Sequence, residues 1–415
     1  MKLLRSGGEL GPVEASTTAA TFLLGYAESD HSVFRPLLGV SRFGGAFGFN
    51  PFELYQAKLV SGPNTFVFGR IGMGKSSLVK SYLARMYAHG YSSVVLDPKG
   101  EYGALSSYFG FSPISFLKDN SGVNPFVTAG NCDGTLAREL NRELAELALS
   151  FVCKRSLTGL ENAALAQALG AVADDLNFVR IRQELIALDR RGGPVAWLGG
   201  YVQGALAELV AGCSILLDSG LVAKTSAGAI VPALHQGILV IDLSLVFGTT
   251  MYSLAVTLVL SAIRAAQLGT GARPTVVAID EVWALTQDRA ALRWLQRYWK
   301  LSRSLGIANL AVTHRLSDLS DLQQGGEDPG SMGLVADSET FVTFAMDDVE
   351  AKRYCSQFGL APELARAISH LERASALWHV GAKIFLVDHY LTRPERHICD
   401  TDSAMSLSGA QVFRP

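Results

Sequence analysis

The chain has 415 residues, of which 49% are hydrophobic and 18% are charged, and its formal net charge is −2. This composition is that of a globular protein, and the length exceeds one compact core of ordinary size, so about two domains are expected. Because the net charge is close to zero, the overall charge does not indicate binding of nucleic acid. The five cysteines are far apart and include no C-x-x-C pair. We therefore expect no zinc site and no disulfide framework, and we expect a cytoplasmic protein.

Residues 1–60 predict a short N-terminal leader of strands and turns, with no secretory signal. The apolar residues 66–68 then predict a buried strand, and residues 76–89 predict a helix that Gly90 closes.

The pattern G-x-x-x-x-G-K-S lies between this strand and this helix, from Gly69 to Ser76. Its glycines allow successive backbone N–H groups to point at phosphate oxygens, and the helix N-terminus adds its positive dipole end. Lys75 would reach the β- and γ-phosphates, and the Ser76 hydroxyl would bind Mg²⁺. A guanine-reading N-K-x-D segment is absent from the sequence, which favours ATP over GTP. The predicted nucleotide-binding residues are Gly69, Arg70, Ile71, Gly72, Met73, Gly74, Lys75, Ser76 and Ser77.

A second predicted strand, residues 93–96, runs into Asp97-Pro-Lys99-Gly-Glu101. We expect it to lie next to the P-loop strand, so that its carboxylates face the same edge of the sheet as the nucleotide. Glu101 is a candidate for a role in catalysis or beside the metal. Capping of the loop or contact with another subunit is the alternative.

Residues 131–212 change in character, because apolar residues recur there at helical spacing with charges between them. We predict an all-helical insertion subdomain, which either covers an edge of the sheet or contacts a partner. The four helices are predicted at residues 136–153, 160–176, 181–188 and 200–209.

The alternation of strand and helix resumes after this segment, with continuous apolar runs such as residues 237–243 and 275–279. Such runs are typical of strands buried on both faces, and the pattern predicts an α/β fold with a mostly parallel sheet. The ATPase domain would comprise residues 61–130 and 213–402, followed by a tail at 403–415. The apolar residues 251–266 are too few to span a bilayer and predict a buried helix. Further strands are predicted at 307–312, 339–344, 376–380 and 384–387, and a helix at 288–304.

Asp280 and Glu281 close the strand at 275–279, as a second nucleotide motif requires. Asp280 would hold the Mg²⁺ hydration shell opposite Ser76, and Glu281 would orient or deprotonate the attacking water. This pair favours hydrolysis over nucleotide storage.

Arg303 precedes the next strand, and His314 and Arg315 follow it. Arg303 is the candidate arginine finger for the γ-phosphate of a neighbouring subunit, and His314 is the candidate sensor of that phosphate. Arg315 is an alternative for either role.

Together these residues resemble the conjugal-transfer ATPases of type IV secretion systems, the TraC-like motors within the HerA/FtsK superfamily. The most specific likeness is the His314-Arg-Leu-Ser-Asp-Leu319 segment, which resembles the actinobacterial form. The resemblance implies a RecA-like domain with a helical subdomain, hexamers with ATP between subunits, and hydrolysis coupled to DNA or protein transfer at the cytoplasmic face of a membrane channel. It extends over about residues 40–402, through Phe47-Gly-Phe-Asn-Pro-Phe52, the P-loop, Asp97-Pro-Lys-Gly-Glu-Tyr102, Asn124-Pro-Phe126, Ile241-Asp-Leu-Ser244 and Ile279-Asp-Glu-Val-Trp283.

The chain departs from the family in two ways. Residues 1–60 cannot supply the large N-terminal docking domain that relatives carry, so we expect a short form or a separate chain with that part. Many relatives also place Gln at the position of His314. Two alternatives stay open beside the secretion motor: a HerA/FtsK-type DNA translocase, and an assembly subunit that binds ATP but turns over little.

Overall fold

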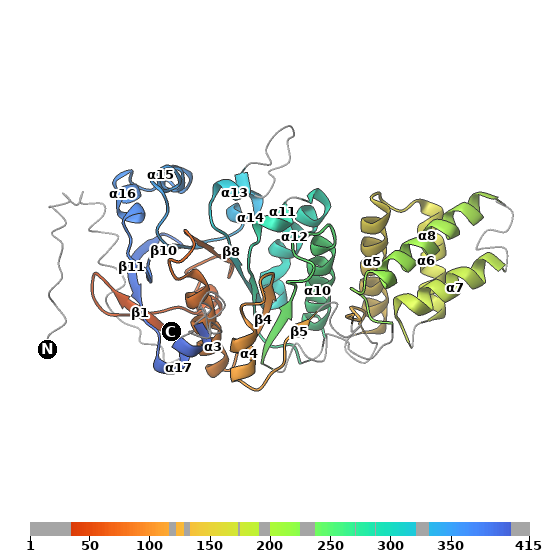
Figure 1. The fold of residues 1–415 in the computed structure, drawn as a ribbon, viewed down its shortest axis with the longest axis horizontal. Helices are drawn as coiled ribbons and strands as arrows, with labels where there is room; N and C mark the ends of the chain where they lie inside the picture. The colour runs from red at the N-terminus through yellow and green to blue at the C-terminus, as the bar shows by residue number, and fades with distance from the viewer. Residues whose placement is uncertain are drawn as a thin grey trace, which may run out of the picture.

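The computed structural model describes residues 35–115, 122–127, 133–172, 175–190, 200–224, 237–269, 271–286, 288–320 and 332–399. These residues form a large sheet with helices on both faces, and four helices lie at one end of the molecule, beyond α10 (Figure 1). The predicted tail and most of the predicted leader lie outside the described residues.

The described strands form an 11-stranded sheet in the order β2-β1-β11-β10-β9-β3-β8-β7-β4-β6-β5. Every pairing from β9 to β5 is parallel, and every pairing from β9 to β2 is antiparallel. The predicted α/β fold with a mostly parallel sheet is thus confirmed. The strands are β1 (Leu37–Ser41), β2 (Ala46–Gly48), β3 (Thr65–Phe68), β4 (Ser92–Asp97), β5 (Ile114–Ser115), β6 (Ile238–Asp242), β7 (Thr275–Ile279), β8 (Ile307–Val312), β9 (Thr340–Thr343), β10 (Ser375–Val380) and β11 (Lys383–His389).

One expectation about the order of strands is wrong: β4 does not lie next to the P-loop strand β3. The neighbours of β3 are β8 and β9, whereas β4 pairs with β6 and β7. Consecutive strands are often neighbours, but here β7 and β8 return to fill the space between β3 and β4. Consequently the segment after β4 lies beside the end of β7, where Asp280 and Glu281 are.

The N-terminal described segment belongs to the sheet, since β1 pairs with β11 and β2 pairs with β1. Where only strands and turns were expected, it also contains a short helix, α2 (Pro51–Gln56). The Asn50 side chain accepts a hydrogen bond from the Phe52 N–H, and Pro51 occupies the first helical position. These are the residue types that favour a helix start.

Alternate strand residues pack against the two faces of the sheet. On β4, Val95 belongs to the core that α3 (Lys75–Ala88) covers, while Val94 and Leu96 belong to the core that includes α10 (Met251–Gln267). Helix α10 is the predicted apolar helix; it is buried along nearly its whole length. No helix among the described residues is long and apolar enough to cross a membrane. The remaining helices of this part are α4 (Gly103–Tyr108), α11 (Trp283–Thr286), α12 (Arg289–Leu301), η3 (Ser302–Leu305), α13 (Ser317–Ser320), α14 (Met332–Ala336), α15 (Asp348–Gln357), α16 (Glu363–Ser369) and α17 (Arg393–Cys399).

The four helices beyond α10 are α5 (Gly134–Cys153), α6 (Gly159–Ala171), α7 (Phe178–Arg190) and α8 (Gly200–Asp218). Helix α5 packs on α10, and the Arg264 guanidinium of α10 is paired with the Glu143 carboxylate of α5. Helix α8 continues to Asp218, past residue 212, the predicted end of the helical segment. This extension follows from packing, because Cys213 and Leu216 are buried in the core that the four helices share.

Candidate nucleotide-hydrolysis site

The candidate site lies where four parallel strands end. The P-loop follows β3, Asp97 ends β4, Asp280 follows β7, and His314 lies two residues beyond the end of β8. Because parallel strands present their carboxyl ends at one edge of a sheet, segments far apart in sequence meet there.

The P-loop backbone requires glycine at its first position. Gly69 has a φ of 142°, and a Cβ there would lie 2.6 Å from the Phe344 Cβ. The Gly69 N–H donates to the His314 carbonyl at 3.2 Å, and the Arg70 N–H donates to the Ala345 carbonyl at 2.9 Å. These bonds fix the loop to the segments after β8 and β9. Ile71, at 80% exposure, points into solvent at the tip of the loop.

Lys75 opens α3, and its side chain turns back beneath the loop. Its ammonium donates to the Gly69 carbonyl, lies 3.1 Å from the Arg70 carbonyl oxygen, and lies 3.0 Å from His314 Nδ1. Burial lowers the pKa of Lys75 to about 8, against the attraction of Glu281 and Asp280. These contacts hold the ammonium where phosphate oxygens can replace the carbonyl groups.

Glu281 is the most tightly held carboxylate of the site. Its φ of 51° is unusual for a residue with a side chain, and only 2% of the residue is exposed. The carboxylate accepts hydrogen bonds from Lys99 Nζ and Trp283 Nε1, and His314 Nε2 lies 2.9 Å away. Burial pushes the pKa of Glu281 upward, but the bonds from His314 and Lys99 outweigh it and lower the pKa to about 2.

His314 connects the two halves of the site. One ring nitrogen faces the Lys75 ammonium and the other faces Glu281. An ammonium can only donate, so Nδ1 accepts from Lys75 and the other ring nitrogen, Nε2, is the donor to the carboxylate. A chain of hydrogen bonds thus runs from the P-loop lysine to Glu281.

Asp280 is 5% exposed and lies beside this chain. The Tyr102 hydroxyl donates to one carboxylate oxygen at 3.1 Å, and the Glu281 N–H donates to the other at 2.9 Å. Burial and the neighbouring Glu281 raise the pKa of Asp280 to about 6.

The donor set suits a magnesium ion that is shared with a nucleotide. Two adjacent buried carboxylates carry more negative charge than Lys99 alone neutralises, and the Ser76 hydroxyl has no protein partner among the described residues. Mg²⁺ is commonly held by one or two protein oxygens together with phosphates and water. The described part of the chain contains no cluster of three or more His, Cys, Asp or Glu that could hold a metal by itself.

The segment after β4 contributes more than the single residue Glu101 singled out from the sequence. Asp97 is 1% exposed and accepts the backbone N–H groups of Lys99, Glu101 and Tyr102 at 3.2, 3.1 and 2.8 Å. This loop thereby directs Lys99 to Glu281 and Tyr102 to Asp280, whereas the half-buried Glu101 carboxylate makes no hydrogen bond or ion pair within the described residues.

The two candidate arginines lie at opposite ends of the strand β8. Arg303 is in η3, before β8 begins, so the structure does not bring it to the P-loop of its own chain. Arg315 follows β8 beside His314; its side chain is exposed and makes no hydrogen bond within the described residues.

Sequence reasoning missed three residues of the site: Lys99, Tyr102 and Trp283. The signal for the first two was the Asp-Pro-Lys-Gly-Glu-Tyr segment, but its targets depend on β4 lying beside β7. Trp283 was named only as the last residue of the Ile279-Asp-Glu-Val-Trp283 segment, and the sequence does not distinguish a hydrogen-bond donor to Glu281 from a packing side chain there.

Known proteins resemble this chain in the sequence of one segment and in the fold. Residues 60–131 match the model of the family described as helicase HerA, central domain. No curated protein matches the chain. Among solved structures, VirB4 of Thermoanaerobacter pseudethanolicus is similar, with a TM-score of 0.63 and 18% identity over 89% of this chain and 99% of that one. The conjugative coupling protein TrwB, in complex with ADP and Mg²⁺, has a TM-score of 0.53 and 16% identity over 80% of this chain and 85% of TrwB.

Proposed function

We infer that the chain is a P-loop ATPase of the HerA/FtsK kind, because its fold is that of VirB4 and TrwB and residues 60–131 match the HerA central-domain model. We propose that it is an ATP-hydrolysing motor subunit that energises a conjugation or type IV secretion apparatus. The observation that carries this proposal is the hydrogen-bond chain from Lys75 through His314 to Glu281, which joins phosphate binding to the hydrolytic carboxylate.

Each site residue has a proposed role. Lys75 and the P-loop N–H groups bind the phosphates, and Ser76 and Asp280 hold Mg²⁺, which would neutralise charge on the phosphates when bound. Glu281 orients the attacking water and takes its proton. A carboxylate that is already bonded to Lys99, Trp283 and His314 must give up at least one of these bonds to do so. Within one chain Arg315 is the better placed of the two arginines to contact a γ-phosphate, and Arg303 is proposed as the finger for a neighbouring subunit.

TrwB has been solved with ADP and Mg²⁺, with the ATP analogue ADPNP and with the GTP analogue GDPNP. These complexes support nucleotide and Mg²⁺ as ligands here, and they show that this fold accepts either base in TrwB. We propose ATP for this chain because its sequence has no guanine-reading segment.

The proposed assembly is a homo-oligomer, a hexamer, that acts with channel proteins at the cytoplasmic face of the membrane. The likeness to VirB4 and TrwB supports it. Residues 61–130 and 213–402 would form the motor domain, with residues 131–212 as a helical subdomain. A DNA translocase is the second candidate, favoured by the match to the HerA central domain.

The test is ATP turnover by the purified chain and by Glu281→Gln, with and without DNA, while light scattering follows the oligomer size. We expect the variant to bind ATP normally and to lose turnover by about 100-fold or more, because the water is no longer activated. Glu363→Gln, at an exposed position of α16, is the matched control. Equal, slow turnover by wild type and Glu281→Gln would refute the motor and favour an assembly subunit. Strong stimulation by DNA would favour the translocase.

A further inference from the structure

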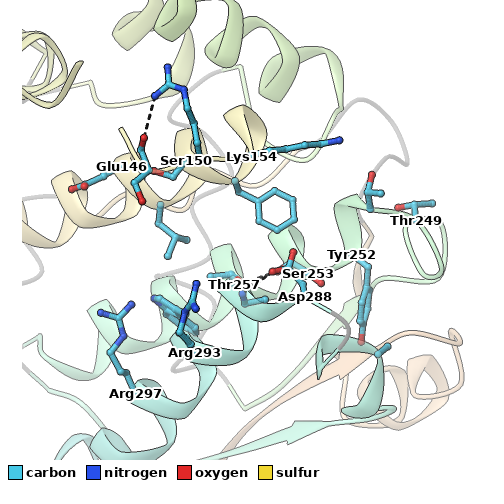
Figure 2. Close-up of a pocket in the computed structure, with 18 of the residues that line it drawn as sticks. Glu146, Ser150, Lys154, Thr249, Tyr252, Ser253, Thr257, Asp288, Arg293 and Arg297 are labelled. Atoms are coloured by element: carbon cyan, nitrogen blue, oxygen red, sulfur yellow. Dashed lines mark hydrogen bonds between the residues drawn. The ribbon is translucent and has the colours of Figure 1, made fainter. Parts of the chain in front are cut away.

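A cleft of about 1150 Å³ lies between helix α5 and the helices α10 to α12 (Figure 2), and no P-loop residue lines it. One wall is the face of α5 that carries Glu146, Ser150 and Lys154, and the opposite wall carries Arg293 and Arg297. The cleft is larger than most small-molecule pockets, which measure roughly 300–1,000 Å³. Its size suits a segment of polypeptide.

The cleft carries unpaired positive charge. Arg293 and Arg297 are exposed, lie one helical turn apart on α12, and make no hydrogen bond or ion pair with any described residue. Lys154, which caps the end of α5, also lines the cleft, and its ammonium is equally unpaired within the described chain; its side chain extends along the α5 wall rather than toward the two arginines (Figure 2).

The acidic groups of the same walls are already engaged. Glu143 is paired with Arg264, and the Asp288 carboxylate accepts the Ala291 N–H at the start of α12. Glu146 lies 3.6 Å from an Arg142 guanidinium nitrogen. The cations therefore remain available to carboxylates that a ligand brings.

Apolar side chains line the space between these charges. Leu147 and Phe151 come from α5, one turn apart, and Phe247 and Trp283 come from the other wall. All four are only partly buried, although they pack against the main core. Hydrophobic anchors between charged groups are what an amphipathic helix needs in order to dock in a groove.

One of these residues also belongs to the nucleotide site. The Trp283 ring lines the cleft, edge-on to Phe247 at 6.4 Å between ring centroids, while its indole N–H donates to the Glu281 carboxylate. A ligand that packs against this ring and turns it changes a hydrogen bond of Glu281. The cleft and the proposed hydrolytic carboxylate thus share one side chain.

We propose that the cleft binds an acidic amphipathic segment of a partner protein, whose carboxylates pair with Arg293, Arg297 and Lys154, and that its occupancy adjusts Glu281 through Trp283. The second half of this proposal rests on the proposed ATPase function, whereas the binding itself does not. A protein segment fits better than nucleic acid because the partly buried Leu147, Phe151 and Phe247 between the charges suit the apolar face of an amphipathic helix, which a phosphate backbone does not offer.

The binding test uses a fluorescent amphipathic helical peptide of Glu, Leu and Ala, and a counterpart in which Lys replaces Glu. Fluorescence anisotropy should show that the Glu peptide binds the full chain, and that binding weakens as salt rises. The double variant Arg293→Glu/Arg297→Glu should bind it at least about tenfold more weakly and should prefer the Lys peptide. Arg366→Glu, an exposed charge reversal on α16, should bind like wild type.

Absence of binding, or equal binding by the double variant, would overturn the proposal. If single-stranded oligothymidine competes with the peptide, and the same two substitutions abolish this competition, then the ligand of the cleft is nucleic acid and not a protein segment. If the peptide does not bind, and the wild type forms an oligomer that the double variant does not form, then the cleft binds a second copy of the chain and not a partner's segment.

The coupling is tested with Trp283→Phe, which keeps a ring in the cleft but removes the N–H donor to Glu281. The peptide should change wild-type ATP turnover at least about twofold, while the variant should bind the peptide as wild type does and show no response. A response retained by the variant refutes the coupling. If wild type hydrolyses no ATP, the proposed function fails, and the anisotropy results still decide whether the cleft binds the peptide.

Discussion

Asp280 is expected to destabilise the folded protein at neutral pH, and Asp280→Asn should therefore be more stable than wild type when no nucleotide or Mg²⁺ is present. The carboxylate is 5% exposed, and Glu281, the next residue, is ionised. Burial raises the pKa of Asp280 from 3.8 to about 6. Ionising Asp280 therefore costs more free energy in the folded state than in the unfolded chain.

The magnitude follows from this difference of about 2 pKa units, which at about 1.4 kcal/mol a unit corresponds to about 3 kcal/mol. The sign is fixed by linkage: above pH 6 the carboxylate is charged in both states and the full cost is present. As pH falls from 6 to 3.8 the folded state binds the proton first, and the cost disappears. Above pH 6 we expect Asp280→Asn to raise the free energy of unfolding by about 1–3 kcal/mol. The gain can fall below the full cost of the charge, because the amide leaves one hydrogen-bond donor less well satisfied than the carboxylate does.

The assay is urea unfolding of wild type and variant at several pH values between about 4 and 8. Glu281→Gln is the internal control with the opposite sign. The pKa of Glu281 is lowered from 4.5 to about 2, so its stabilisation is fully present above pH 4.5 and is lost as pH falls toward 2. A loss of stability in Asp280→Asn at pH 7.5, or a gain that does not change with pH, would refute the reasoning.

Two further predictions concern the P-loop. Burial lowers the pKa of Lys75 to about 8, so the affinity for ATP should fall by about tenfold for each pH unit above 8. Equilibrium binding of a fluorescent ATP analogue measures this affinity, and an unchanged affinity at pH 9 would contradict the prediction. Gly69→Ala should lose nucleotide binding and about 2 kcal/mol of stability in thermal unfolding, because its Cβ meets Phe344 at a φ of 142°. Gly110→Ala, which has a φ of 82° but open space around the Cβ, should cost less and keep nucleotide binding.

The sequence was sufficient to predict the parallel part of the fold, because β4, β6, β7 and β8 are short apolar runs that can only be buried on both faces. It was also sufficient to place Asp280 at the carboxyl end of a strand. The order of the strands could not be predicted, since nothing in β4 shows whether β3 or β7 will be its neighbour. That order decides which side chains Lys99 and Tyr102 reach.

Long-range pairs are the part of the site that a local pattern does not contain. Lys99 lies 182 residues before Glu281, and Lys75 lies 239 residues before His314. The prediction that Arg303 contacts the nucleotide of a neighbouring subunit also depends on long-range arrangement, because it requires η3, which precedes β8, to face the P-loop of another chain. Charge and residue type identify candidates, but only the fold shows which of them meet.

The arrangement of His314 gives a physical reason for coupling between phosphate binding and Glu281. In this structure one imidazole accepts from Lys75 and donates to Glu281, so both groups are held by the same ring. A γ-phosphate that draws the Lys75 ammonium toward itself leaves His314 Nδ1 without its donor. Without that donor the ring is less firmly held, and any rotation of the ring changes its bond to Glu281. Lys99 and Trp283 hold the carboxylate until that point, so we expect Glu281 to be released toward water only after phosphate has entered the P-loop.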